Sequence, residues 1–104
     1  MKGEEIIESI TTRLFETGQI VSTRGVFEKM QEYPHLAQFV NESLQRHIKG
    51  DWGNVCDEDK QENELSLKEG YRLLSAYVTK DLPKIWIITE ADRSATTILF
   101  PDEY

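Results

Sequence analysis

Hydrophobic and polar residues follow a helical period over the first two thirds of the chain and a strand period near its end. Residues 4–15 carry apolar side chains at helical spacing, which predicts a helix with one face toward a core. The β-branched segment at residues 19–23 predicts a short strand or an extended segment. Residues 26–32 predict a short helix that ends before Pro34, because the residue that precedes a proline avoids helical angles.

The clearest helical pattern covers residues 34–49, with a proline in its first turn and Gly50 directly after it. Residues 57–69 also favour a helix, and the acidic residues at its start complement the positive end of the helix dipole. Its two leucines, Leu65 and Leu67, fall on roughly opposite faces of that helix. We therefore expect this helix to be anchored only lightly.

The last third of the chain is rich in aromatic and β-branched residues and predicts strands at residues 71–79, 85–90 and 96–100. Linkers of hairpin length join these strands, so they are expected to form an antiparallel meander. The first strand has apolar residues on both faces. Either helices cover parts of both faces of the sheet, or the second face meets a partner.

These elements predict an α+β fold within a single domain, residues 1–104. Three to four helices are expected to pack on a C-terminal three-stranded antiparallel β-meander, with residues 19–23 as an optional short extra N-terminal strand. The hydrophobic share of 38% is sufficient for such a core, because the apolar residues cluster in recognisable segments.

Composition indicates a cytoplasmic protein without a membrane segment. Glu4, Glu5 and Glu8 occupy the stretch where a signal peptide needs apolar residues, and the apolar runs are too short to cross a membrane. The single cysteine, Cys56, cannot form an internal disulfide and fits a reducing compartment.

The negative charge is concentrated in one part of the chain. The formal net charge is −7, and residues 51–70 hold seven acidic residues against two basic ones. Binding to a phosphate backbone requires a basic stripe that releases counterions, and the sequence contains none. Direct binding to nucleic acid is therefore not expected.

One candidate reactive pair is Cys56 with His47, near Asp51 and Asp57. A cysteine and a histidine could form an activated thiolate or ligate zinc. A zinc site usually needs four ligands in recognisable pairs, and His47 falls on the apolar face of its helix, where a hydrogen-bonded core histidine is more common. We predict no catalytic residue, no metal site and no cofactor.

Two segments are candidates for contact with a partner protein. The first combines a tryptophan turn with the acidic run, because an exposed Trp is a common binding anchor and carboxylates complement a basic surface; its residues are Trp52, Asp57, Glu58, Asp59 and Glu62. The second is a hairpin loop with Glu90, Asp92 and Arg93, which could hold a partner through paired charges or serve acid–base chemistry. The competing structural interpretations are a Trp that plugs the core edge, a solvated helix face and a solvated turn.

A resemblance to a known family is carried by three segments: HIKGDWGN, GYRLLSAY and KIWIITEADRSATTILFPDEY. They are similar to a family of small bacterial proteins labelled plasmid-related, which belong to plasmids, phages and conjugative elements. The similarity runs from about Gly18 to Tyr104. Two departures affect the hairpin geometry and the charge of the turn: residues 80–83 lack the family's glycine turn, and Asn54 stands where an acid is common.

The resemblance implies a mobile genetic element as the setting and assigns no catalytic residue. Small acidic proteins in that setting are often inhibitors of host defence enzymes. The leading hypothesis is a small acidic protein-binding module, and its sharper form is an inhibitor of a host defence nuclease, of anti-CRISPR or anti-restriction type. Such an inhibitor would bind a basic nucleic-acid-binding host protein by occupying its surface or mimicking nucleic acid.

Two alternatives remain open at this point. The chain could be a homo-oligomeric accessory protein of the element that dimerises through the second face of the meander. It could also be a small enzyme that uses Cys56 with His47, or Glu90 with Asp92.

Overall fold

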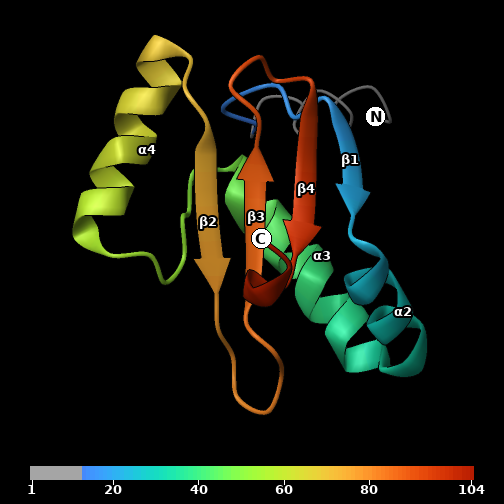
Figure 1. Ribbon diagram of the computed structural model, residues 1–104. Coiled ribbons are helices and arrows are strands. Elements are labelled where there is room, and N and C mark those ends of the chain that lie inside the picture. Colours follow the sequence, from blue (N-terminus) through green and yellow to red (C-terminus); the bar gives the residue numbers. More distant parts are fainter. Residues whose placement is uncertain (1–12) are drawn as a thin grey trace, which may run out of the picture.

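The computed structural model describes residues 13–104 and contains, in this part of the chain, three α-helices and four strands in an α+β fold (Figure 1). The strands are β1 (Gln19–Ser22), β2 (Leu73–Tyr77), β3 (Ile85–Thr89) and β4 (Ala95–Leu99). The helices are α2 (Arg24–Glu32), α3 (Pro34–Ile48) and α4 (Asp57–Glu69), followed at the chain end by the 3-10 turn η1 (Pro101–Glu103). The helix expected at residues 4–15 lies outside the described residues, apart from residues 13–15, which are not helical.

The three helices begin and end close to the positions that the sequence predicts. Helix α2 starts two residues earlier than expected because the Thr23 hydroxyl caps it, accepting a hydrogen bond from the Val26 amide at 3.3 Å. Helix α3 has Pro34 at its first position, where a missing amide proton costs nothing. Helix α4 ends at Gly70, whose φ of 80° lies in the left-handed region that glycine adopts most easily.

The four strands form one sheet in the order β1-β4-β3-β2. The pairs β2–β3 and β3–β4 are antiparallel and joined by hairpins, which confirms the expected meander. The expectation of a purely antiparallel three-stranded sheet was incomplete, because β1 joins β4 as a fourth and parallel strand.

The β1–β4 pairing joins segments that are far apart in the sequence. The Gln19 amide donates to the Ser94 carbonyl oxygen, and the Thr23 amide donates to the Ile98 carbonyl oxygen, both at 3.0 Å. These bonds bracket β1 and fix its register on β4. A parallel pair requires a long crossover connection, so no local turn signal in the sequence predicts this pairing.

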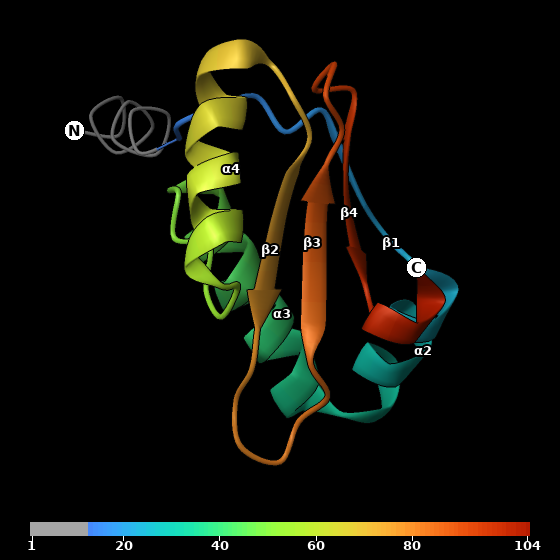
Figure 2. The ribbon, with the colours of Figure 1, turned by 60° about the vertical axis from the view of Figure 1, so that its left-hand side comes forward.

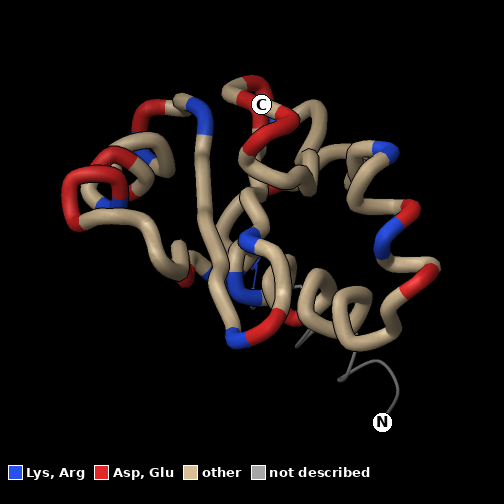
Figure 3. The backbone as a smooth tube through the Cα atoms, turned by 60° about the horizontal axis from the view of Figure 1, so that its bottom comes forward, with Lys and Arg blue, Asp and Glu red and all other residues tan. Residues whose placement is uncertain are grey.

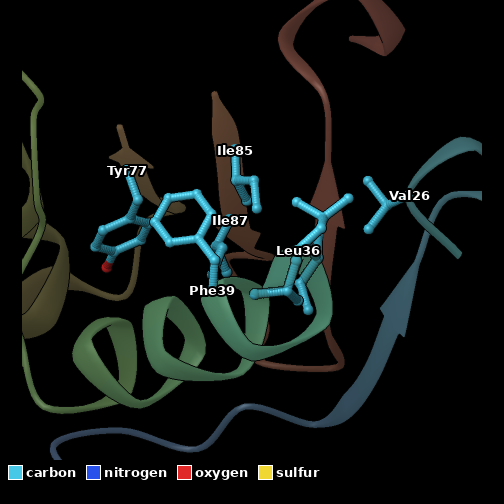
Figure 4. Close-up of a cluster of buried hydrophobic side chains, with 8 residues drawn as sticks. Val26, Leu36, Phe39, Tyr77, Ile85 and Ile87 are labelled. Carbon is cyan, nitrogen blue, oxygen red and sulfur yellow. The ribbon is translucent and has the colours of Figure 1, made fainter. Parts of the chain in front are cut away.

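The main core lies between the sheet and α3, and α2 packs against α3 (Figures 1 and 2). Leu36 and Phe39 reach from α3 toward the side chains of Tyr77, Ile85 and Ile87 on the sheet (Figure 4). These residues are buried, together with Val26, Val40 and Ile98. The alternation along β3 places Trp86 on the opposite face.

The opposite face is covered in part by the end of the chain. The rings of Tyr104 and Trp86 meet edge to face, with centroids 5.6 Å apart. The Arg72 guanidinium donates to the Tyr104 hydroxyl at 2.6 Å. In Figure 2, η1 lies on the side of the sheet away from α3. Part of the second apolar face is therefore covered from within the chain.

Candidate functional site

Helix α4 carries six exposed acidic residues. The four nearest its start, which we call the α4 acidic surface, are Asp57, Glu58, Asp59 and Glu62. Three of them lie in the first turn, where negative charge is stabilised by the helix dipole. In the part of the chain that the structure describes, the ion pairs are Arg24–Glu28 and Arg46–Asp51, and neither involves α4. The acidic positions follow one another along α4 at one side of the molecule (Figure 3). Their charge is thus directed to solvent.

Helix α4 lies alongside β2, at the edge of the sheet (Figures 1 and 2). Its buried residues are both polar, Asn63 and Ser66. The Asn63 amide group donates to the Leu74 carbonyl oxygen at 2.8 Å and accepts from the Leu74 amide at 3.1 Å. A side-chain amide therefore takes the place of a neighbouring strand at this position of β2. The contact of α4 with the sheet thus includes hydrogen bonds, and none of the apolar side chains of α4 is fully buried.

The turn before α4 continues the protection of the β2 edge. The Ala76 amide donates to the Trp52 carbonyl oxygen at 3.3 Å, and the Asn54 side chain accepts from the Val78 amide at 3.0 Å. Gly53 approaches so closely that an added Cβ would lie 2.1 Å from the Ala76 carbonyl oxygen. The turn and α4 thus form one segment that satisfies the outer backbone groups of β2.

Trp52 is buried, with 4% of its surface exposed, and it offers no area to a partner. Its indole nitrogen donates to Glu64 at 2.8 Å, and its ring stacks on Phe15 with centroids 6.2 Å apart. The ring also meets the imidazole of His47 edge to face at 5.8 Å. The expectation that Trp52 anchors a partner was therefore wrong, because the indole plugs the edge of the core.

Asp51 stabilises the same turn from outside. Its carboxylate accepts two hydrogen bonds from Arg46, at 2.7 and 3.2 Å, and one from the Gly53 amide at 3.1 Å. The bond from Arg46 is the main reason that the pKa of Asp51 lies below its ordinary value. Asp51 is therefore a structural carboxylate of the turn.

A chain of hydrogen bonds crosses the core beneath the turn. The Nδ1 atom of His47 lies 2.6 Å from the Ser75 hydroxyl, and its Nε2 atom lies 2.9 Å from the Thr89 hydroxyl. The Thr89 hydroxyl lies 2.8 Å from that of Thr96, which donates to the Thr17 carbonyl oxygen at 2.8 Å. All five residues are buried. The chain connects α3 to β2, β3, β4 and the segment before β1.

The number of available protons fixes the direction of these bonds. Each hydroxyl donates one hydrogen bond, so Thr96, which donates to Thr17, accepts from Thr89. Thr89 then accepts from the Nε2 proton of His47, and the bare Nδ1 accepts from the Ser75 hydroxyl. Burial lowers the pKa of His47 to about 3, so the ring is neutral at neutral pH.

The structure does not join Cys56 to His47. Cys56 is exposed just before α4, whereas His47 is fully buried with both ring nitrogens bonded to hydroxyls. Among residues 13–104, no group of three or more His, Cys, Asp and Glu side chains is placed to hold a metal ion. The geometry thus agrees with the interpretation of His47 as a hydrogen-bonded core histidine.

The loop between β3 and β4 separates its three candidate residues. Glu90 and Asp92 are exposed, and Asp92 accepts a hydrogen bond from the Ser94 amide at 3.0 Å. Hydrogen bonds from the Ser94 side chain and amide hold the pKa of Asp92 below its ordinary value. This direction is opposite to the raised pKa that a general acid needs.

Arg93 turns inward. Its guanidinium donates to the carbonyl oxygens of Tyr71 at 2.7 Å and Ser66 at 3.1 Å, and also to those of Glu90 and Ala91. The cation therefore joins the loop to the last turn of α4, where the helix dipole favours positive charge. These bonds give Arg93 a structural role in the loop, and its contact with a partner stays a prediction.

A groove of about 330 Å³ runs beside the contact between α4 and β2 and borders the α4 acidic surface. Asp59 and Glu62 line it from α4, and Tyr71, Arg72 and Leu74 line it from the other side. The structure thus brings part of the acidic surface next to an exposed aromatic ring and an arginine. Sequence reasoning did not identify Tyr71, Arg72 or Asn63 as neighbours of this surface.

The buried hydroxyls were also missed, although the sequence carries a signal for them. Ser75, Thr89 and Thr96 occupy inward positions of three strands, where apolar residues are usual. A hydroxyl at such a position needs a buried partner, and His47 on the apolar face of α3 supplies one.

None of the protein-family models, curated proteins or solved structures compared with the chain matches it. Within the described residues, no helix has the length and apolar character needed to cross a membrane.

Proposed function

We propose that the chain is a small protein-binding module of a mobile genetic element and that it presents the α4 acidic surface to a basic partner protein. The observation that carries this proposal is a row of exposed carboxylates on one helix, with no ion pair to a described residue. Charges of this kind are little screened by the rest of the molecule and can complement a basic surface.

The specific form of the proposal is inhibition of a host defence nuclease, of anti-CRISPR or anti-restriction type. Such enzymes bind nucleic acid through basic grooves, and a helix with several exposed carboxylates can occupy such a groove. The support is the concentration of negative charge in residues 51–70 and its display on α4. Glu90 and Asp92 are further exposed acidic residues, in the loop that follows β3.

Charge reversal tests the proposal. The variant with Asp57→Lys, Glu58→Lys and Glu62→Lys should lose a partner that the wild-type chain captures from host-cell extract at low salt, because the complex depends on these carboxylates. A control variant with Glu16→Lys, Glu32→Lys and Glu42→Lys changes the net charge equally at exposed positions outside α4 and should retain the partner.

Circular dichroism and thermal unfolding establish that both variants fold. High salt should release the partner from the wild-type chain, since salt screens exposed charges. A partner retained by the α4 variant, or lost equally from both variants, contradicts the proposal. In a nuclease assay, an α4 variant that inhibits as well as the wild type would also contradict the proposal.

A further inference from the structure

Helix α4 differs from α2 and α3 in how it is attached to the rest of the molecule. Helix α3 buries Leu36, Phe39 and Val40 in the main core, whereas α4 buries only Asn63 and Ser66. Leu65 is 46% exposed. Since apolar burial is the dominant stabilising contribution in folding, α4 adds little of its own to the core.

Three polar contacts, which we call the tethers, hold α4 in place. They are the paired bonds between Asn63 and Leu74, the bond from the Trp52 indole to Glu64, and the bond from Arg93 to the Ser66 carbonyl oxygen. Each of them joins α4 to a different part of the molecule. Water can replace each of these hydrogen bonds when the helix moves away. The net free energy lost on release is therefore small.

The geometry around α4 permits such a movement. Gly53 and Gly70 stand on either side of the helix with φ of 73° and 80°, in the region where glycine is the least restricted residue. The groove between α4 and β2 leaves part of the helix without close packing against the sheet. Carboxylates on α4 repel one another, and the described ion pairs do not relieve that repulsion.

We propose that α4 is a detachable element that releases from β2 as one unit, while α2, α3 and the rest of the sheet remain folded. Release breaks the tethers and exposes the backbone amide and carbonyl of Leu74 at the edge of β2. A partner that binds one of the two states more tightly shifts the equilibrium between them. The proposal concerns the motion of α4 and holds whether or not the α4 acidic surface binds a partner.

Native-state hydrogen exchange tests this proposal at two adjacent amides. The Leu74 amide points outward to Asn63, whereas the Ser75 amide points the opposite way, toward β3. If α4 releases separately, its own amides lose protection as well, because a detached helix of 13 residues is marginal in water. The Leu74 amide then exchanges together with the α4 amides and with a weak dependence on denaturant. The Ser75 amide exchanges only with global unfolding, together with the β3 amides.

Equal free energies and equal denaturant dependence for the Leu74 and Ser75 amides would overturn the proposal. Measurement on the wild-type chain alone therefore decides whether α4 releases separately.

A substitution in the tethers gives a second test. Asn63→Leu removes both bonds to Leu74 at similar side-chain size, so the α4 amides should exchange about tenfold faster or more. The β3 amides should accelerate by a similar factor, because global unfolding breaks the same bonds. Gln61→Leu, at an exposed position of the same helix, is the control and should leave α4 exchange unchanged. An Asn63→Leu variant whose α4 amides exchange at the wild-type rate contradicts a release that breaks these bonds.

Discussion

The imidazole of His47 is the most strongly constrained ionisable group among the residues that the structure describes. It is fully buried, both of its nitrogens are hydrogen-bonded to hydroxyls, and no carboxylate among residues 13–104 is bonded to it to stabilise a positive charge. Protonation would add a proton at Nδ1, where Ser75 already donates. The neutral ring is therefore part of the folded state.

This arrangement predicts a dependence of stability on pH. The pKa of His47 is about 3 in the folded chain and 6.5 for an unperturbed histidine, so only the unfolded chain gains a proton between these values. The contribution of neutral His47 to the free energy of unfolding is fully present above about pH 6.5. Well below that value it falls by about 1.4 kcal/mol per pH unit. Urea unfolding at pH 7.5 and pH 5.5 measures the loss.

His47→Gln removes the titrating group and is expected to flatten this dependence while lowering stability at pH 7.5. The exposed His35 is present in both proteins, so any effect of its titration on stability is common to both measurements. Equal slopes for the wild type and His47→Gln would show that His47 is not the group responsible.

Arg93 is the second residue whose role is structural. Arg93→Ala removes the bonds to Ser66 and Tyr71 and should lower the free energy of unfolding by about 1.5–3 kcal/mol, the range for hydrogen bonds that involve a charged group. Arg93→Lys should recover only part of the loss, because an ammonium group lacks the fork that reaches both carbonyl oxygens. Glu90→Ala, at an exposed position of the same loop, should stay within about 0.5 kcal/mol of wild type. Comparable losses for the Arg93 and Glu90 variants contradict this role.

At the scale of elements, the local patterns and the long-range pairings differ in how well the sequence predicts them. The bounds of α4 and the two hairpins follow from helix propensity, capping and turn length, all of which are local. The attachment of β1 to β4 and the contact of Asn63 with β2 depend on segments that meet only in the folded chain. Asn63 is a polar residue within an acidic helix, so the sequence pattern does not predict its contact with β2.

Gly18 is the point where the β1–β4 pairing can be tested. Its φ is 61°, and a Cβ there would lie 2.2 Å from the Ser94 carbonyl. Gly18→Ala should therefore destabilise the protein by more than about 2 kcal/mol in urea unfolding. Gly70→Ala is the matched control, because Gly70 has a φ of 80° with nothing near the added atom; its cost should be about 1 kcal/mol. Equal costs for the two variants contradict close packing of Gly18 against the β3–β4 loop.

At the scale of the whole molecule, the core and the acidic helix occupy different places around the sheet. The core lies on one face with α3, and the α4 acidic surface lies beyond the β2 edge (Figures 1 and 3). The sequence predicts the acidic helix at residues 57–69, because its residues favour a helix and its acidic start complements the helix dipole. It does not predict that Trp52 and Arg93 are used inside the fold, since burial of a Trp and the partners of an Arg depend on tertiary contacts.

The most direct test of the α4 acidic surface is a binding titration with a partner captured by the wild-type chain, purified and measured at low and at high salt. We expect the Asp57, Glu58 and Glu62 reversal to Lys to weaken binding by about tenfold or more at low salt, with a smaller difference at high salt. The Glu16, Glu32 and Glu42 reversal should bind within about threefold of wild type. Equal affinities for the wild type and the α4 reversal at low salt would contradict a function based on this surface.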